Sequence, residues 1–386
     1  MKIFKDKKLK DAYLLLSNNE CLKGVSIGYS GSTFGELVFN TSITGYQEII
    51  SDPSYKNQII TFTYPHIGNV GFNINDYEAN DTYVNGVVVN QLPTNPSNWR
   101  AESSFSDFLI KNKIICIADI DTRYLTSMLR DKGSLNACIS TEVKKINSLQ
   151  DKLKKYNGII GMDLAKEVST KKSYFFNEKN YYVDNKKIKS KQKYSVVAYD
   201  FGIKKNILKI LKDLGCKTKV IPANTKAKDV LNMNPDGIFL SNGPGDPAAC
   251  KYAIDSIKEF YKHNIPLFGI CLGHQLMGIA SGAETIKMPH GHHGANHPVI
   301  DLKTKRVFIT SQNHGFVINE KSIPSSIEVT HKSLFDDTIQ GIKFKKKPFF
   351  SFQGHPEASP GPQDMAYIFL NFINNMKKYK CQKEKI

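Results

Sequence analysis

The second half of the chain alternates short apolar runs with longer amphipathic segments. The short runs have the length and the Val, Ile and Phe content of buried strands, and they occupy residues 195–199, 218–221, 237–240 and 266–270. Apolar residues three and four positions apart predict helices at residues 203–214 and 252–261, and another helix is expected from Gly273. This alternation predicts a doubly wound, mostly parallel sheet with helices on both faces.

The first half has a different pattern, in which short apolar runs are separated by turns. These runs predict strands at residues 36–39, 58–62, 86–89 and 114–118. One helix is expected over residues 122–131, because Gly133 follows it as a stop signal. The pattern predicts a β-rich α/β domain.

The two patterns define a domain organisation for an α/β protein. We predict an N-terminal domain over residues 1–150, a linker over residues 151–193 and a doubly wound domain over residues 194–386. From about residue 170 the linker is rich in Lys, Asn and Tyr. Its aromatic part is expected to hold a short strand.

Charge and Cys content limit which partners and which cellular compartment are expected for this protein. The net charge of +17 could indicate a nucleic-acid partner, but only four of the 53 basic residues are Arg, and the Lys residues are spread over both halves. No nucleic acid is therefore expected. Seven Cys without a C-x-x-C pair indicate a reducing compartment, so cytoplasm is the expected location, with a plastid stroma as the alternative.

No membrane partner is expected either. The basic N-terminal segment has an apolar run only over residues 12–16, shorter than the roughly 7–15 apolar residues of a signal peptide. No stretch approaches the roughly 18 apolar residues of a membrane span.

Cys271 has the sequence context of a catalytic nucleophile. It follows the predicted strand 266–270 directly, precedes a helix, and has Gly269 and Gly273 two positions away on either side. This is the logic of the nucleophile elbow, in which small neighbours permit a strained turn and the helix N-terminus favours a thiolate. The backbone N–H of Leu272 would then point into an oxyanion hole. The alternative is a structural Cys between two packing glycines.

His355 and Glu357 provide a base and a group that orients it. They lie in the run 351–357 after a strand-like segment, and Pro356 favours extended backbone for His355. In extended backbone, side chains two positions apart point the same way, so Glu357 can hold the imidazole. Cys271, His355 and Glu357 therefore form a predicted nucleophile–base–carboxylate set, although His-Pro-Glu alone could be a polar turn.

These motifs resemble the class I, triad-type glutamine amidotransferases. The Gly- and Pro-rich run 241–247, after the predicted strand 237–240, is similar to the oxyanion-hole loop of that family. It is no Walker A loop, because no Gly-Lys-Ser/Thr follows it. Asp200-Phe201-Gly202 matches a kinase motif, but the other kinase motifs are missing from the sequence, so we discard that interpretation.

The N-terminal half resembles one particular family within this class. The segments that resemble the small-subunit family of carbamoyl-phosphate synthetases are residues 39–48, 63–69, 118–123 and 161–165. Other class I amidotransferases lack this N-terminal domain. The likeness covers nearly the whole chain.

The resemblance implies a glutaminase that transfers the γ-glutamyl group to Cys271 and releases ammonia. Carried over by position, Cys271, His355 and Glu357 are catalytic. The residues expected to hold L-glutamine are Ser54, Gly243, Gly245, Leu272, Gln275, Asn313, Gly315 and Phe316. Ser54 would bring the N-terminal domain to the site. Asn313, Gly315 and Phe316 lie in the run 312–316, for which composition alone predicts a turn.

No cofactor is expected on this chain. His290, His292, His293 and His297 lie close together, but their spacing fits no zinc template and the nearby glycines suggest a turn, so no metal is expected. No phosphate-binding fingerprint is present. The resemblance implies that ATP and Mg are used by a large synthetase subunit, which receives the ammonia and makes carbamoyl phosphate for arginine and pyrimidine synthesis.

Three alternatives remain open. Another amidotransferase component, such as that of anthranilate or GMP synthetase, would use the same triad but would lack the N-terminal domain. A γ-glutamyl hydrolase or cysteine peptidase could use the same core on other substrates. A non-enzymatic binding module with a vestigial triad is disfavoured, because Cys271, His355 and Glu357 are all present.

Overall fold

A computed structural model describes residues 9–93, 95–178 and 192–383 of the chain. The chain separates into two compact units by its internal contacts. Unit 1 consists of Met1–Ile160 and Pro289–Gly294, and unit 2 consists of Gly161–Met288 and Ala295–Ile386.

This division differs from the predicted boundaries, because much of the expected linker belongs to folded elements. Helix α4 (Ile146–Lys154) precedes the end of unit 1, and α5 (Leu164–Val168) and strand β8 (Tyr174–Phe175) belong to unit 2. Apolar side chains of α4 and α5 are buried in the cores. The short strand expected in the aromatic part exists as β8. The remainder of the predicted linker, residues 179–191, lies outside the described residues.

Unit 1 is built on a closed barrel of seven strands in the order β1-β2-β6-β5-β4-β3-β7. The strands are β1 (Asp11–Leu16), β2 (Cys21–Ser26), β3 (Ser32–Asn40), β4 (Gln58–Phe62), β5 (Gly86–Val88), β6 (Ile115–Ala118) and β7 (Leu135–Ser140). The neighbours β3, β4, β5 and β6 pair in parallel, and the remaining pairs are antiparallel. The four strands predicted in this half are confirmed, but the closure was not foreseen, because local patterns do not reveal which strands pair.

Alternate residues of these strands pack against different helices. Ile60 and Val87 join a cluster with side chains of α1 (Tyr46–Ser51) and α2 (Phe105–Lys111). Their neighbours Ile59 and Val88 join a cluster with α3 (Thr122–Lys132) instead. Because successive side chains of a strand point to opposite faces, each strand contributes to two separate hydrophobic clusters. The predicted helix is present as α3 and is followed by Gly133 with φ 88°.

Unit 2 contains a ten-stranded sheet in the order β14-β13-β15-β16-β17-β12-β11-β9-β10-β8. Its strands, besides β8, are β9 (Tyr194–Asp200), β10 (Cys216–Pro222), β11 (Gly237–Leu240), β12 (Leu267–Ile270), β13 (Thr285–Asp301), β14 (Val307–Ile318), β15 (Ile327–Ser333), β16 (Ile339–Phe344) and β17 (Phe349–Phe352). The five central strands, from β10 to β17, are parallel. Their carboxyl ends therefore meet at one edge.

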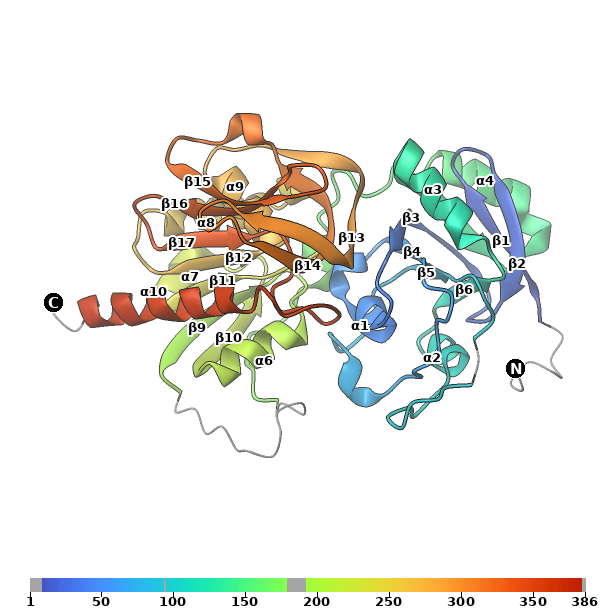
Figure 1. Ribbon diagram of the computed structural model, residues 1–386, viewed down its shortest axis with the longest axis horizontal. Helices are drawn as coiled ribbons and strands as arrows, with labels where there is room; N and C mark the ends of the chain where they lie inside the picture. The colour runs from blue at the N-terminus through green and yellow to red at the C-terminus, as the bar shows by residue number, and fades with distance from the viewer. Residues whose placement is uncertain (1–8, 94, 179–191, 384–386) are drawn as a thin grey trace. The chain divides into compact units, whose positions relative to one another are not determined.

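Helices cover both faces of this parallel region, as the predicted doubly wound fold requires (Figure 1). Residues of α7 (Ala227–Asn232), α8 (Lys251–Phe260) and α9 (Leu272–Ala280) pack with Ile238 and Leu240. Residues of α6 (Lys205–Asp213) and α10 (Tyr367–Lys383) pack with Phe239 on the opposite face.

Two segments expected to be turns are strands instead. Residues 290–297 lie within β13, and residues 312–316 lie within β14. Their Gly, His and Asn content suggested turns, but these strands are neighbours in the sheet, and pairing supplies the backbone hydrogen bonds that decide the conformation. Among the described residues, no helix is long and apolar enough to cross a membrane.

Candidate functional site

Cys271 occupies a sharp turn between strand β12 and helix α9. Its backbone has φ 51° and ψ −105°, a strained conformation that costs on the order of 1–3 kcal/mol for a residue with a side chain. A Cβ on Gly273 would collide with the carbonyl oxygen of Leu240, and a Cβ on Gly269 would lie 2.7 Å from the backbone of Gly273. The Cys271 N–H donates to the carbonyl oxygen of Phe352 at 2.9 Å. The elbow predicted from sequence is present, and the two glycines permit it.

The loop after β11 lies beside this elbow. A Cβ on Gly243 would collide with the carbonyl oxygen of Phe201 and would come within 3.0 Å of the Leu272 side chain. Across the part of the chain that the structure describes, the N–H groups of Gly243 and Leu272 donate no hydrogen bond. The Gly273 N–H donates to the carbonyl oxygen of Ser241 at 3.0 Å, which ties the loop to the start of α9. Two backbone donors beside a nucleophile are what an oxyanion hole needs.

His355 and Glu357 form a buried hydrogen-bonded pair. The imidazole Nδ1 lies 2.7 Å from Glu357 Oε1, and the side chains are 2% and 0% exposed. The His355 N–H donates to the carbonyl oxygen of Ser311 at 2.8 Å, which fixes the backbone of the base against β14. The orientation expected from the spacing of two residues is therefore present.

Cys271 is close enough to His355 to influence its protonation. Burial alone would lower the pKa of His355, but the charge of Glu357, the interaction with the Cys271 sulfur and the hydrogen bond with Glu357 raise it to about 10. The Nε2 atom makes no hydrogen bond of standard geometry among the described residues. Such contacts are often loose before substrate binds. The sulfur itself lies 3.5 Å from the carbonyl oxygen of Asn313.

A third buried charged residue, Lys204, contacts the His355–Glu357 pair. The sequence did not predict this contact. Its Nζ lies 3.2 Å from Glu357 Oε1 and donates to the carbonyl oxygen of Ala358 at 2.6 Å. Burial would raise the pKa of Glu357, but the charges of Lys204 and His355 lower it to about 2. The available signal was position: Lys204 lies four residues after Asp200, the last residue of β9, near the start of the helix predicted over residues 203–214.

Several of the predicted glutamine ligands of unit 2 lie at the elbow or contact helix α9, among them Leu272, Gln275 and Asn313. Gln275, one turn after Cys271, donates from Nε2 to the carbonyl oxygen of Phe316 at 2.8 Å. Gly315 has open space around its Cα, and a Cβ there would meet nothing within 4 Å. Gly245 has φ 95°, and a Cβ on it would lie 2.7 Å from the carbonyl oxygen of Met162.

Ser54 belongs to unit 1. It is buried in a 3₁₀ turn (Pro53–Tyr55), where its N–H donates to Asp52 Oδ1 at 2.9 Å. Its role as a glutamine ligand stays a prediction.

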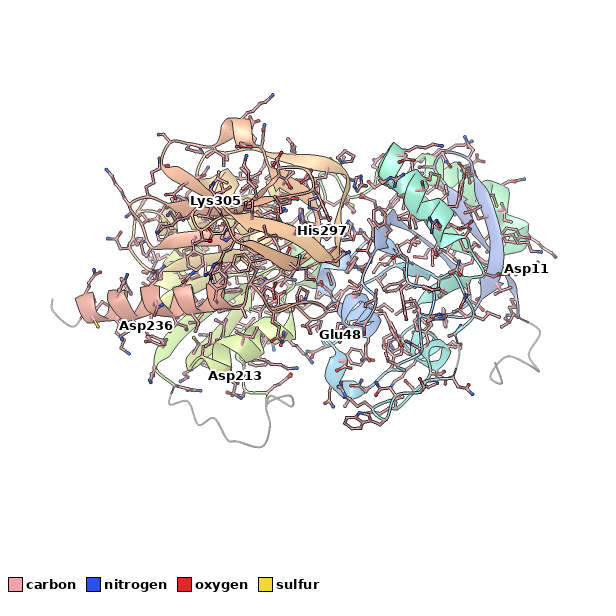
Figure 2. The ribbon with its side chains drawn as sticks, in the orientation of Figure 1. Asp11, Glu48, Asp213, Asp236, His297 and Lys305 are labelled. Carbon is pink, nitrogen blue, oxygen red and sulfur yellow. The ribbon has the colours of Figure 1, made fainter. Side chains whose placement is uncertain are left out.

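No group of three or more His, Cys, Asp or Glu side chains suited to a metal ion occurs in the described parts of the chain. His297, labelled in Figure 2 on β13, packs edge-on against Phe335 with ring centroids 5.1 Å apart. His290 stacks on Phe39 at 6.0 Å, and His293 lies 6.1 Å from the ring of Tyr55. These rings make aromatic contacts.

The fold and the site define a class of protein. The sequence pattern of class-I glutamine amidotransferases matches residues 197–375. The matched region contains the elbow, the loop after β11 and the His355–Glu357 pair. Unit 2 is therefore a class-I glutamine amidotransferase domain.

The N-terminal half identifies the family. The pattern of the carbamoyl-phosphate synthase small chain domain matches residues 14–139. The carbamoyl phosphate synthase small chain of Photorhabdus laumondii is 55% identical over 381 residues, which cover 97% of this chain and 98% of that protein. The small chain of Pectobacterium atrosepticum is 53% identical over 96% of this chain and 99% of its own length. This chain belongs to the carbamoyl phosphate synthase small chain family, the glutaminase subunits of that enzyme.

Proposed function

We propose that Cys271, His355 and Glu357 hydrolyse L-glutamine through a γ-glutamyl thioester. The observation that carries this proposal is the buried His355–Glu357 pair beside a Cys held at a strained turn. A protonated imidazole next to the sulfur stabilises negative charge on it, so the sulfur can attack as a thiolate.

The first half-reaction forms the thioester. The Cys271 thiolate attacks the side-chain carboxamide carbon, and the new oxyanion accepts hydrogen bonds from the N–H groups of Leu272 and Gly243. The imidazolium of His355 then gives its proton to the amide nitrogen, the C–N bond breaks, and ammonia leaves. Glu357 holds the imidazole in the orientation that this transfer requires.

The second half-reaction releases glutamate. Neutral His355 takes a proton from water as the oxygen attacks the thioester carbonyl. The tetrahedral intermediate collapses, the C–S bond breaks, and the Cys271 thiolate returns beside the imidazolium. The remaining predicted ligands, including Ser54, Gln275 and Asn313, would hold the amino acid through both steps.

We further propose that the ammonia is used by a large synthetase subunit. That subunit would bind ATP and Mg, activate bicarbonate and make carbamoyl phosphate for arginine and pyrimidine synthesis. Membership in the small chain family supports this partner. No cofactor is proposed for this chain itself.

The substitution Cys271→Ser tests the proposal in the assembled enzyme. We expect glutamine-dependent synthesis of carbamoyl phosphate to be abolished, while synthesis from added ammonia survives, because only the glutaminase step needs the sulfur. The exposed Cys21, changed to Ser, is the matched control and should leave both activities intact. Glutamine-dependent synthesis that persisted in Cys271→Ser would require another nucleophile and would refute the assignment.

A further inference from the structure

Four buried glutamine side chains lie within unit 2 and form two hydrogen-bonded pairs, one of which includes a predicted glutamine ligand. Gln275, Gln312, Gln340 and Gln353 are each at most 3% exposed. Gln275 Nε2 donates to Gln353 Oε1 at 3.2 Å, whereas Gln312 Nε2 donates to Gln340 Oε1 at 2.9 Å. The pair of Gln275 and Gln353 therefore contains a predicted glutamine ligand. The pair of Gln312 and Gln340 is similar but makes no hydrogen bond to Gln275.

The orientation of the Gln275 amide follows from its partners. The carbonyl oxygen of Phe316 can only accept a hydrogen bond, so the atom of Gln275 that lies 2.8 Å from it must be the nitrogen. The second hydrogen of this NH₂ group goes to Gln353, whose facing atom must then be its oxygen. Both donors of the Gln275 amide are thus engaged, and Gln353 supplies one of the two acceptors.

This arrangement leaves the carbonyl oxygen of Gln275 available. Its Oε1 accepts no hydrogen bond within the described ranges. It is also not among the fully enclosed atoms that lack a partner, so part of its surface is exposed. The Gln275 N–H donates to the carbonyl oxygen of Cys271 at 3.1 Å, which places the two residues one helical turn apart.

We propose that Gln353 is a positioning residue that sets the selectivity of the site for the α-ammonium group of its substrate. The inference rests on the proposed glutaminase function. When the carboxamide carbon of L-glutamine is at Cys271, its ammonium group lies a few bonds away and meets the Gln275 oxygen, an acceptor. Gln353 acts by keeping the Gln275 nitrogen turned away from that ammonium group.

The test compares two amide substrates that differ only in the α-amino group. The assembled enzyme is assayed for hydrolysis of L-glutamine and of 4-carbamoylbutanoate, and the ratio of the two kcat/KM values measures recognition of the ammonium. In Gln353→Met, which removes the acceptor but keeps the length of the side chain, we expect this ratio to fall roughly three- to tenfold, the effect of one hydrogen bond. We expect KM for L-glutamine to rise while its kcat stays nearly the same, and kcat/KM for 4-carbamoylbutanoate to change little.

Gln340→Met is the matched control. Gln340 is as deeply buried and also accepts a hydrogen bond from an amide, but it does not contact Gln275. This variant can lose stability, yet its ratio should equal that of the wild type. If Gln353→Met fails to fold, Gln353→Asn serves instead, because it keeps an amide but withdraws the oxygen by one methylene.

Three results would overturn the inference. They are an unchanged ratio in the Gln353 variant, an equal loss for both substrates, and a wild type that does not discriminate between them. If the wild type failed to hydrolyse L-glutamine, or if Cys271→Ser hydrolysed it equally well, the proposed function would fail first and the inference with it.

Discussion

The ammonium group of Lys204 lies 3.2 Å from the carboxylate of Glu357, and both side chains are almost completely withdrawn from water. Taking two charges out of water is costly, and their attraction compensates only when further hydrogen bonds complete the arrangement. Here Lys204 also donates to the carbonyl oxygen of Ala358, and Glu357 also accepts from His355. Lys204 is therefore the countercharge that keeps Glu357 ionised beside the base.

Lys204→Met should destabilise unit 2 and weaken the base together. Removing one partner of a buried pair leaves the other charge uncompensated, which typically costs about 3–5 kcal/mol of unfolding free energy. Denaturant unfolding measures this loss, and single-turnover thioester formation should be slower because Glu357 loses the charge that lowers its pKa.

Lys205→Met is the neighbouring control. Its Nζ lies 3.7 Å from Glu178, and that pair is partly exposed, so we expect a loss of at most about 1 kcal/mol and an unchanged rate. Equal losses of unfolding free energy in the two variants would show that the buried pair stabilises the protein no more than the exposed pair does.

Glu357→Gln should move the alkaline limit of activity to lower pH. The charge of Glu357 raises the pKa of His355, which reaches about 10. Without that charge the imidazolium loses its proton at lower pH, so the acid that protonates the departing amide nitrogen is lost at lower pH. Rates of thioester formation between pH 7 and 10 report the shift, and at pH 8 we expect a loss on the order of 10²-fold.

Glu259→Gln provides the comparison for this profile, because Glu259 is a surface carboxylate paired with Lys262. Its pH profile should match the wild type. A Glu357→Gln profile with an unmoved alkaline limit would contradict the role given to this carboxylate.

Gly243→Ala should impair catalysis through the loop after β11. The added Cβ collides with the carbonyl oxygen of Phe201, so the loop must shift and its N–H moves away from the oxyanion. Loss of one oxyanion donor lowers kcat on the order of 10²-fold. Gly315→Ala is the structural control, since a Cβ there meets nothing within 4 Å and should leave the melting temperature unchanged. A folded Gly243→Ala enzyme with full kcat would exclude this loop from the oxyanion hole.

His274 should make the protein less stable in acid. It is fully buried, its Nδ1 lies 2.9 Å from Ser351 Oγ, and burial lowers its pKa from 6.5 to about 3. The unfolded chain therefore binds a proton below pH 6.5 that the folded chain does not, so stability is complete above pH 6.5 and falls as the pH drops towards 3. At pH 5 the loss from this group is about 2 kcal/mol.

The difference in unfolding free energy between pH 7 and pH 5 measures this contribution. In His274→Gln, which cannot titrate, the difference should shrink by about 2 kcal/mol relative to the wild type. His263 is exposed, and His263→Gln should leave the difference as it is. A pH dependence that is identical in wild type and His274→Gln would refute the prediction.

The sequence predicted the elements around the nucleophile well because they depend on local chemistry. Apolar runs and helical spacing located β9 to β12 and the helices α6 and α8, although α7 between β10 and β11 was not predicted. The glycines around Cys271 indicated the elbow that the backbone adopts. The two-residue spacing of His355 and Glu357 predicted their mutual orientation, which the 2.7 Å contact confirms. Each of these inferences involves residues that are neighbours along the chain.

The tertiary structure alone decided which distant groups meet. Lys204 reaches Glu357 because the carboxyl ends of parallel strands gather at one edge, and Gln353 reaches Gln275 because β17 lies beside β12. Strand pairing also turned the expected loop at residues 312–316 into part of β14 and closed the barrel of unit 1. A sequence pattern carries the local preference of each segment, whereas pairing energy and the burial of charge arise only when separate segments come together.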